Sequence, residues 1–195
     1  SPTDPSSYTI KASAVDTLIL LGNRSNIIVS NLAIEGSGMY GVESYNATNV
    51  SVINCSFNNN TKAVYIWNTN DANVDNNSIN NSFNGAILVS NNQRKRINIK
   101  NNTITNTSLM LGMGLFWSDS DLKTIVAKTD TTTASNYINI INNTIINCGL
   151  TGIQFQGSNV TIRRNVIDSF LRTIDDGGGI YTYTNNQTLN TLNFR

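Results

Sequence analysis

The sequence contains no histidine, which excludes catalytic triads, zinc sites and acid–base steps that need an imidazole. Only 13% of the 195 residues are charged and the net charge is +1, so we expect no nucleic-acid partner. Hydrophobic runs are too short to span a membrane, and we expect no membrane span. Because histidine is absent, any catalysis must use Asp, Glu, Lys, Arg or Tyr side chains.

Asparagine and isoleucine are abundant instead: the chain has 34 Asn and 23 Ile. Isoleucine is β-branched and favours strands, whereas asparagine favours turns and tolerates the left-handed backbone conformation. This composition predicts many short strands joined by tight turns.

A repeat of 22–25 residues runs through the chain, with one longer step of 41 residues. Its first apolar column contains Val29, Val52, Val74, Ile99, Ile140 and Ile162. A second column, five residues later, contains Ile34, Phe57, Ile79, Ile104, Ile145 and Ile167. A third strand is expected to begin with Val42, Val64, Ala86, Leu115, Ile153 and Ile180. The long step predicts an insertion at about 118–135.

These columns indicate a chain that coils once per repeat and stacks like residues about 4.8 Å apart. No single coil can bury its apolar face, so stacking must create the core. One column is polar, with Leu32 and Cys55 followed by Asn77, Asn102, Asn143 and Asn165. Stacked asparagines hydrogen-bond along such an axis. The sequence therefore predicts an all-β, single-stranded parallel solenoid of about seven coils with an Asn ladder.

The pattern "NVxIxNNxIxN…GIxφ" resembles the right-handed parallel β-helix of pectin-lyase-like proteins over residues 18–183. The resemblance implies one β-helix domain over 1–195, which we expect to be a portion of a larger protein. The fold family includes polysaccharide lyases, polygalacturonase-type hydrolases, uronan epimerases, phage tailspikes and adhesins. We therefore expect a polysaccharide or glycan partner and an extracellular, periplasmic or cell-surface location.

The two cysteines, Cys55 and Cys148, fall three coils apart, which is roughly 14 Å at the stacking distance. A disulfide needs Cα atoms within about 7 Å. We therefore expect two free, buried thiols.

The resemblance implies that a glycan lies in a groove outside one sheet, walled by loops that lengthen the repeat. Longer connections around coils 4 to 6 favour that region, and the third strands would provide the groove's base. Alternation predicts outward-facing Glu43, Tyr45 and Ile87, and it predicts a set of substrate-binding residues. That set is Tyr65, Trp67, Phe116, Gln154, Gln156, Tyr181 and Tyr183. Aromatic rings stack on sugars and amides hydrogen-bond to hydroxyls.

Catalytic candidates lie in and before the stretch "TIDDGGGIYTYTNN", residues 173–186. Asp175 and Asp176 offer carboxylates for glycoside hydrolysis, which needs one acid and one base or nucleophile. Adjacent residues on extended backbone point opposite ways, so we expect one of them to pair with another acid. The candidates are Asp168, Asp119 and Asp121, or Glu43 at greater distance, and Arg172 is a further catalytic candidate. The run is similar to glycosidase-like β-helix proteins but lacks the Gly-His-Gly and Arg-Ile-Lys elements of polygalacturonase-type hydrolases.

Two alternatives to a hydrolase stay open. A lyase or uronan epimerase would use Arg163, Arg164 or Arg172, with Tyr181 or Tyr183 as the acid. A non-catalytic adhesin or tailspike-like rod would leave the paired aspartates as a capped turn before a glycine bend. We expect no cofactor. Ca²⁺ ligands could come from Asp119, Asp121, Asp175 and Asp176, but no tight spacing supports a calcium site.

Overall fold

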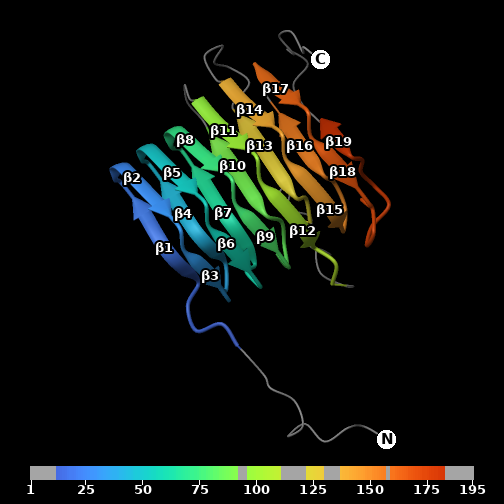
Figure 1. Cartoon of the computed structure of the whole chain (residues 1–195), viewed down its shortest axis with the longest axis horizontal. Coiled ribbons are helices and arrows are strands. Elements are labelled where there is room, and N and C mark those ends of the chain that lie inside the picture. Colours follow the sequence, from blue (N-terminus) through green and yellow to red (C-terminus); the bar gives the residue numbers. More distant parts are fainter. Residues whose placement is uncertain (1–11, 92–95, 111–121, 130–136, 157–158, 183–195) are drawn as a thin grey trace, which may run out of the picture.

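Strands account for all the regular secondary structure in the described part of the chain, and they form a parallel solenoid (Figure 1). The computed structural model describes residues 12–91, 96–110, 122–129, 137–156 and 159–182. The coils succeed one another along the axis from β1 to β19. This confirms the predicted all-β parallel solenoid.

Three sheets make up the wall of the solenoid. Sheet A contains β1 (Thr17–Gly22), β4 (Tyr40–Tyr45), β7 (Lys62–Trp67), β10 (Ile87–Asn91), β13 (Ile125–Thr129), β16 (Ile153–Gln156) and β19 (Ile180–Thr182). Sheet B contains β2 (Ser25–Ser30), β5 (Thr48–Ile53), β8 (Asn70–Asp75), β11 (Arg96–Lys100), β14 (Tyr137–Ile141) and β17 (Val160–Arg163). Sheet C contains β3 (Ala33–Glu35), β6 (Ser56–Asn58), β9 (Ser78–Asn80), β12 (Thr103–Thr107), β15 (Thr144–Cys148) and β18 (Val166–Asp168). Within the described residues, these strands make six full coils and one strand of a seventh.

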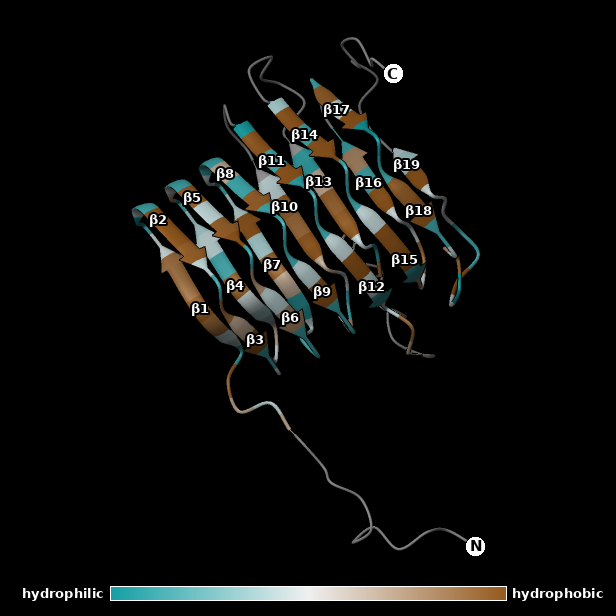
Figure 2. Cartoon of the chain, in the orientation of Figure 1, coloured by the Kyte–Doolittle hydropathy of each residue, from teal (hydrophilic) through white to brown (hydrophobic). Residues whose placement is uncertain are grey.

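The first two apolar columns are confirmed residue by residue. Val29 pairs with Val52 in sheet B, and Ile34 pairs with Phe57 in sheet C. Their side chains, with those of the following coils, form one continuous core. Figure 2 shows the hydrophobic colours concentrated in the strands and hydrophilic colours in the connections. Stacked Ile, Val and Phe thus supply the main apolar burial of the fold.

The third column was wrong in two coils. Ile87, not Ala86, pairs with Val64, and Ile125 pairs with Ile87 in the next coil. Ile87 is 1% exposed and therefore faces inward, contrary to the prediction that it faces outward. Leu115, which we expected in this column, lies outside the described residues.

The predicted insertion at about 118–135 was also misplaced, because β13 lies inside it and belongs to sheet A. The extra residues of this repeat come before β13 in the sequence, between Thr107 at the end of β12 and Ile125 at the start of β13. Periodicity alone could not decide whether the third strand of this repeat comes before or after the extra residues. Both "GLF" and "TIV" resemble the start of an apolar strand.

The Asn ladder is confirmed at the turn between sheets B and C. Asn77, Asn102 and Asn143 each donate from Nδ2 to Oδ1 of the next asparagine at 2.9 Å, ending at Asn165. The Oδ1 atom of each of these four asparagines also accepts a backbone N–H group, beginning with Cys55 N to Asn77 Oδ1 at 2.9 Å. These buried amides therefore satisfy backbone groups that the turn leaves unpaired.

A second, exposed asparagine column occupies the adjacent turn position with left-handed backbone. Asn54, Asn76, Asn101 and Asn142 have φ between 53° and 56°. Asparagine is one of the few non-glycine residues that adopts this region readily. The abundance of asparagine is thereby explained by turn geometry as well as by stacking.

Both cysteines are free and buried, as predicted. Burial raises the pKa of the Cys148 thiol. Among the residues that the structure describes, there is no helix that could cross a membrane.

Candidate functional site

Four aromatic side chains gather on the outer face of sheet A, in the second and third coils. This aromatic platform consists of Tyr40 and Tyr45 from β4 and Tyr65 and Trp67 from β7. The rings of Tyr40 and Tyr65 stack with centroids 4.7 Å apart, and those of Tyr45 and Trp67 are tilted at 6.4 Å. Trp67 is 39% exposed. The platform is thus an ordered apolar surface that remains open to solvent.

Strand register places these rings side by side. Tyr45 lies opposite Trp67, and Glu43 lies opposite Tyr65. The neighbours Val42, Val64 and Ile66 are at most 1% exposed, so alternation turns the platform residues outward. The sequence pattern predicted the outward orientation of Tyr45, Tyr65 and Trp67, and the structure confirms it.

Gly22 gives Tyr45 its place on the first coil. An ideal Cβ at Gly22 would overlap the ring of Tyr45, so the tyrosine ring occupies the space that any side chain would need. The Tyr45 ring therefore extends the platform over β1.

Tyr40 was missed by sequence reasoning. It has the same parity as Val42, which is 0% exposed, so simple alternation assigns both to the interior. Its ring nevertheless stacks on outward-facing Tyr65. Gly41 lies between Tyr40 and Val42, and an ideal Cβ at this glycine would lie 2.8 Å from the Ala63 carbonyl oxygen. Regular alternation is lost at this corner, and the glycine at 41 was the available signal.

Glu43 places a carboxylate within the platform. Thr17 donates its hydroxyl to Oε2 of Glu43 at 3.0 Å. Burial raises the pKa of Tyr65, and the nearby charge of Glu43 raises it further. The Tyr65 hydroxyl therefore stays protonated at neutral pH and can act as a hydrogen-bond donor.

Further along the axis, the column of outward positions that continues from Tyr65 on sheet A is buried. Leu88, Val126 and Gln154 continue the register of Tyr65 but are 7%, 1% and 3% exposed. Gln154 also has a buried Oε1 without a hydrogen-bond partner. The Gln154 side chain is thus buried, and its role in substrate binding stays a prediction.

The other predicted substrate-binding residues lie near the end of sheet A or outside the described part. Gln156 and Tyr181 are half-buried on β16 and β19. Phe116 and Tyr183 lie outside the described residues. The platform and these C-terminal residues are therefore separated along the axis by at least three coils, roughly 14 Å.

The predicted catalytic residues all lie on the last full coil and the connection that follows it. Asp168 ends β18, and its carboxylate accepts a hydrogen bond from the Ser169 hydroxyl at 3.3 Å. Arg172, Asp175 and Asp176 are exposed in the connection to β19. Within the described residues, neither Asp175 nor Asp176 has a side-chain hydrogen bond or ion pair. Their catalytic roles stay predictions.

The backbone around the two aspartates is firmly attached to the previous coil. Thr173 donates its backbone N–H to Gly149 O at 2.8 Å and its hydroxyl to Ser108 O at 3.0 Å. An ideal Cβ at Gly177 would lie 2.6 Å from the Thr151 hydroxyl, so the glycine allows close packing there. These contacts give "TIDDGGG" a clear structural purpose in addition to any chemical one.

Among the described residues, no group of three or more acidic or sulfur side chains is arranged to hold a metal ion.

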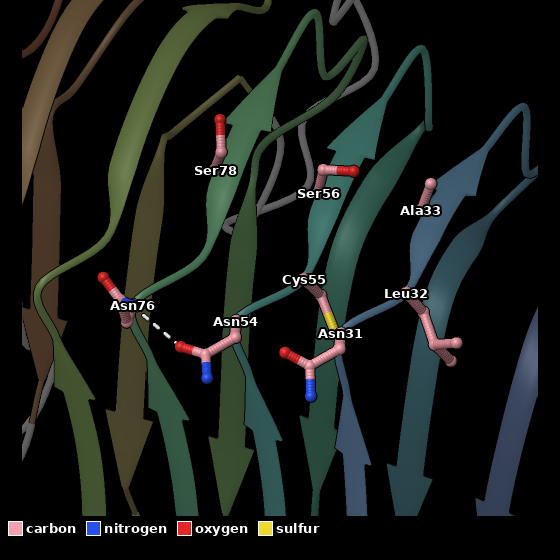
Figure 3. Close-up of a pocket in the computed structure, with 8 residues that line it drawn as sticks. All are labelled: Asn31, Leu32, Ala33, Asn54, Cys55, Ser56, Asn76 and Ser78. Carbon is pink, nitrogen blue, oxygen red and sulfur yellow. Dashed lines mark hydrogen bonds between the residues drawn. The ribbon is translucent and has the colours of Figure 1, made fainter.

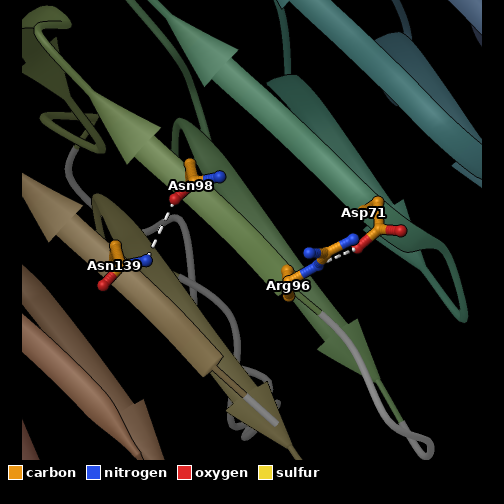
Figure 4. Close-up of polar contacts among 4 residues, drawn as sticks. All are labelled: Asp71, Arg96, Asn98 and Asn139. Carbon is orange, nitrogen blue, oxygen red and sulfur yellow. Dashed lines mark hydrogen bonds and ion pairs between the residues drawn. The ribbon is translucent and has the colours of Figure 1, made fainter.

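The ion pair that joins sheet B side chains is between Arg96 Nε and Asp71 Oδ1, 2.7 Å apart (Figure 4). Its neighbour in the figure is the amide contact from Asn139 to Asn98, at 3.0 Å. Both contacts lie on the outside of the stack and resemble the turn ladders rather than a reaction centre.

A pocket of about 570 Å³ lies elsewhere, at the turn between sheets B and C of the first three coils. Figure 3 shows small side chains in a row, Ala33, Ser56 and Ser78, beside the turn asparagines. Its lining has no charged and no aromatic side chain. It lacks the groups for acid–base chemistry or sugar stacking, so the aromatic platform is the better candidate.

One comparison identifies a family. A family model described as "Right handed beta helix region" matches residues 6–133 of the 195. Comparison with curated proteins and with solved structures found no match.

Proposed function

The chain belongs to the family of right-handed β-helix proteins, and on that premise we propose that it acts on a polysaccharide, which it binds along the outer face of sheet A. The aromatic platform of Tyr40, Tyr45, Tyr65 and Trp67 carries this proposal. Ordered aromatic rings beside hydrogen-bonding groups suit a ligand with one apolar ring face and hydroxyl edges.

A polymer lying parallel to the solenoid axis would meet an equivalent position about every 4.8 Å. The platform spans three successive coils, because Tyr45 reaches over Gly22 of β1. The proposal thus favours an extended chain over a single sugar.

Hydrolysis is a second candidate, ahead of elimination or epimerisation. The observation that favours it is the exposure of three carboxylates on the last coil and its connection, those of Asp168, Asp175 and Asp176. An adhesin or tailspike-like rod would bind the same polymer without cutting it.

Affinity electrophoresis through gels containing neutral polysaccharides tests binding. Trp67→Ala should weaken retardation about tenfold, because an exposed stacking surface is lost. Tyr137→Ala removes an aromatic ring that is 53% exposed on sheet B, and it should leave retardation unchanged. Equal loss in both variants, or no retardation of the wild type by any polymer, contradicts the proposal.

Gly22→Ala provides a variant that keeps every aromatic residue. The new methyl group should displace the Tyr45 ring and weaken binding several-fold. New reducing ends that disappear in an Asp175→Asn/Asp176→Asn double variant would identify a hydrolase, and unsaturated uronate absorbance would identify a lyase. Binding without either product would identify a non-catalytic protein.

A further inference from the structure

Glu43 is the acidic group of the aromatic platform, and one of its carboxylate oxygens is available to a ligand. It lies between Leu20 and Tyr65 in the register of sheet A and is half-buried. Only one of its two oxygens receives a described hydrogen bond, from Thr17. Within the described residues Glu43 has no ion pair.

We propose that Glu43 makes the platform selective for neutral sugars and against uronates. The inference rests on the proposed glycan-binding function and names its substrate class. The free oxygen of Glu43 can accept hydrogen bonds from sugar hydroxyls, which are donors. A uronate carboxylate has no proton to donate at neutral pH and carries the same charge as Glu43.

Cations near the platform do not reverse this preference. Lys62 begins β7 opposite Tyr40, but it is 8% exposed and already has an interaction partner. Lys128 lies on β13, two strands beyond β7. A uronate held against Tyr65 therefore meets Glu43 first. This is the opposite of a polyuronate site, which requires a cation to neutralise the carboxylate.

The expected discrimination follows from Coulomb's law. Two like charges about 5 Å apart in water weaken affinity about fourfold, and a partly shielded surface increases the factor toward about tenfold. Salt should reduce the factor, because exposed charges are screened.

Polymer pairs that differ in charge provide the test. Polygalacturonate is compared with its methyl ester, and carboxymethylcellulose with hydroxyethylcellulose, by affinity electrophoresis or calorimetry. The wild type should prefer the uncharged member about four- to tenfold, and Glu43→Gln should bring the ratio close to one. Glu35→Gln makes the same charge change on β3 of sheet C and should keep the wild-type ratio.

The outcomes separate this inference from the proposed function. A wild type that binds both members of a pair equally, or a Glu43→Gln variant that keeps the wild-type ratio, overturns the role of Glu43 and leaves glycan binding intact. A wild type that binds no polymer, neutral or charged, overturns the proposed function and this inference together. Preference for the charged member would reverse the assigned substrate class.

Discussion

Replacing Asn102 by alanine should test the energetic role of the buried ladder. The Asn102 side chain is 1% exposed and makes four hydrogen bonds. Its Oδ1 accepts from Asn77 N and Asn77 Nδ2, and its Nδ2 donates to Val74 O and Asn143 Oδ1. The methyl side chain of alanine can make none of these hydrogen bonds.

The loss of folding free energy depends on which groups lose all of their hydrogen-bond partners. Asn77 Nδ2 keeps Val52 O at 3.0 Å, and Asn143 Oδ1 keeps the Asn102 backbone N–H at 3.1 Å. The buried Asn77 backbone N–H loses its acceptor, which costs about 1–3 kcal/mol. The other three lost bonds add about 1 kcal/mol each, so we expect a total of about 4–6 kcal/mol.

Chemical denaturation followed by circular dichroism measures this loss. Asn98→Ala is the matched control, because Asn98 is half-buried on β11 and accepts one amide bond, from Asn139. Water can replace that bond, and the control should lose about 0.5–1 kcal/mol. Equal losses in the two variants, or a loss below about 1 kcal/mol for Asn102→Ala, would refute the reasoning.

Three further predictions concern the turns, an ion pair and the thiols. Asn142 has φ of 56°, so Asn142→Ala should be about 1 kcal/mol less stable than Asn142→Gly, and equal unfolding midpoints would contradict left-handed backbone there. The hydrogen bond from Arg96 lowers the pKa of Asp71, and Arg96→Gln should return that pKa toward the ordinary value in an NMR titration. Because the folded-state pKa is lowered, the pair stabilises the protein above about pH 4, and this small contribution disappears as the pH falls through the folded-state pKa. Cys55 and Cys148 should react with a thiol reagent only after unfolding, and rapid reaction of either thiol in the native protein would show that its coil opens.

Periodicity predicted most of the fold because each repeat satisfies the same packing requirement. Columns of Ile and Val, such as Val29 to Ile162, could be aligned by spacing alone, and the Asn ladder followed from them. The third strand of the long repeat could not be found this way. Two apolar segments near Leu115 and Ile125 competed for one place in sheet A, and only strand pairing selects Ile125.

The candidate site was less predictable, because it depends on how side chains meet across coils. Alternation identified Tyr65 and Trp67, but the stacking of Tyr40 depends on the irregular corner at Gly41. Burial of Gln154 could not be read from its outward parity. The acidic stretch at 175–176 attracted attention for its composition, whereas much of its local sequence reflects close packing on the preceding coil.

An NMR titration with a neutral oligosaccharide tests the central claim most directly, because it reports where a glycan binds regardless of whether it is cut. The account predicts saturable shifts of the Trp67 indole and of the Tyr40, Tyr45 and Tyr65 rings, with none at Tyr137. Shifts confined to the last coil around Asp175 and Asp176, with the aromatic platform unaffected, would contradict it.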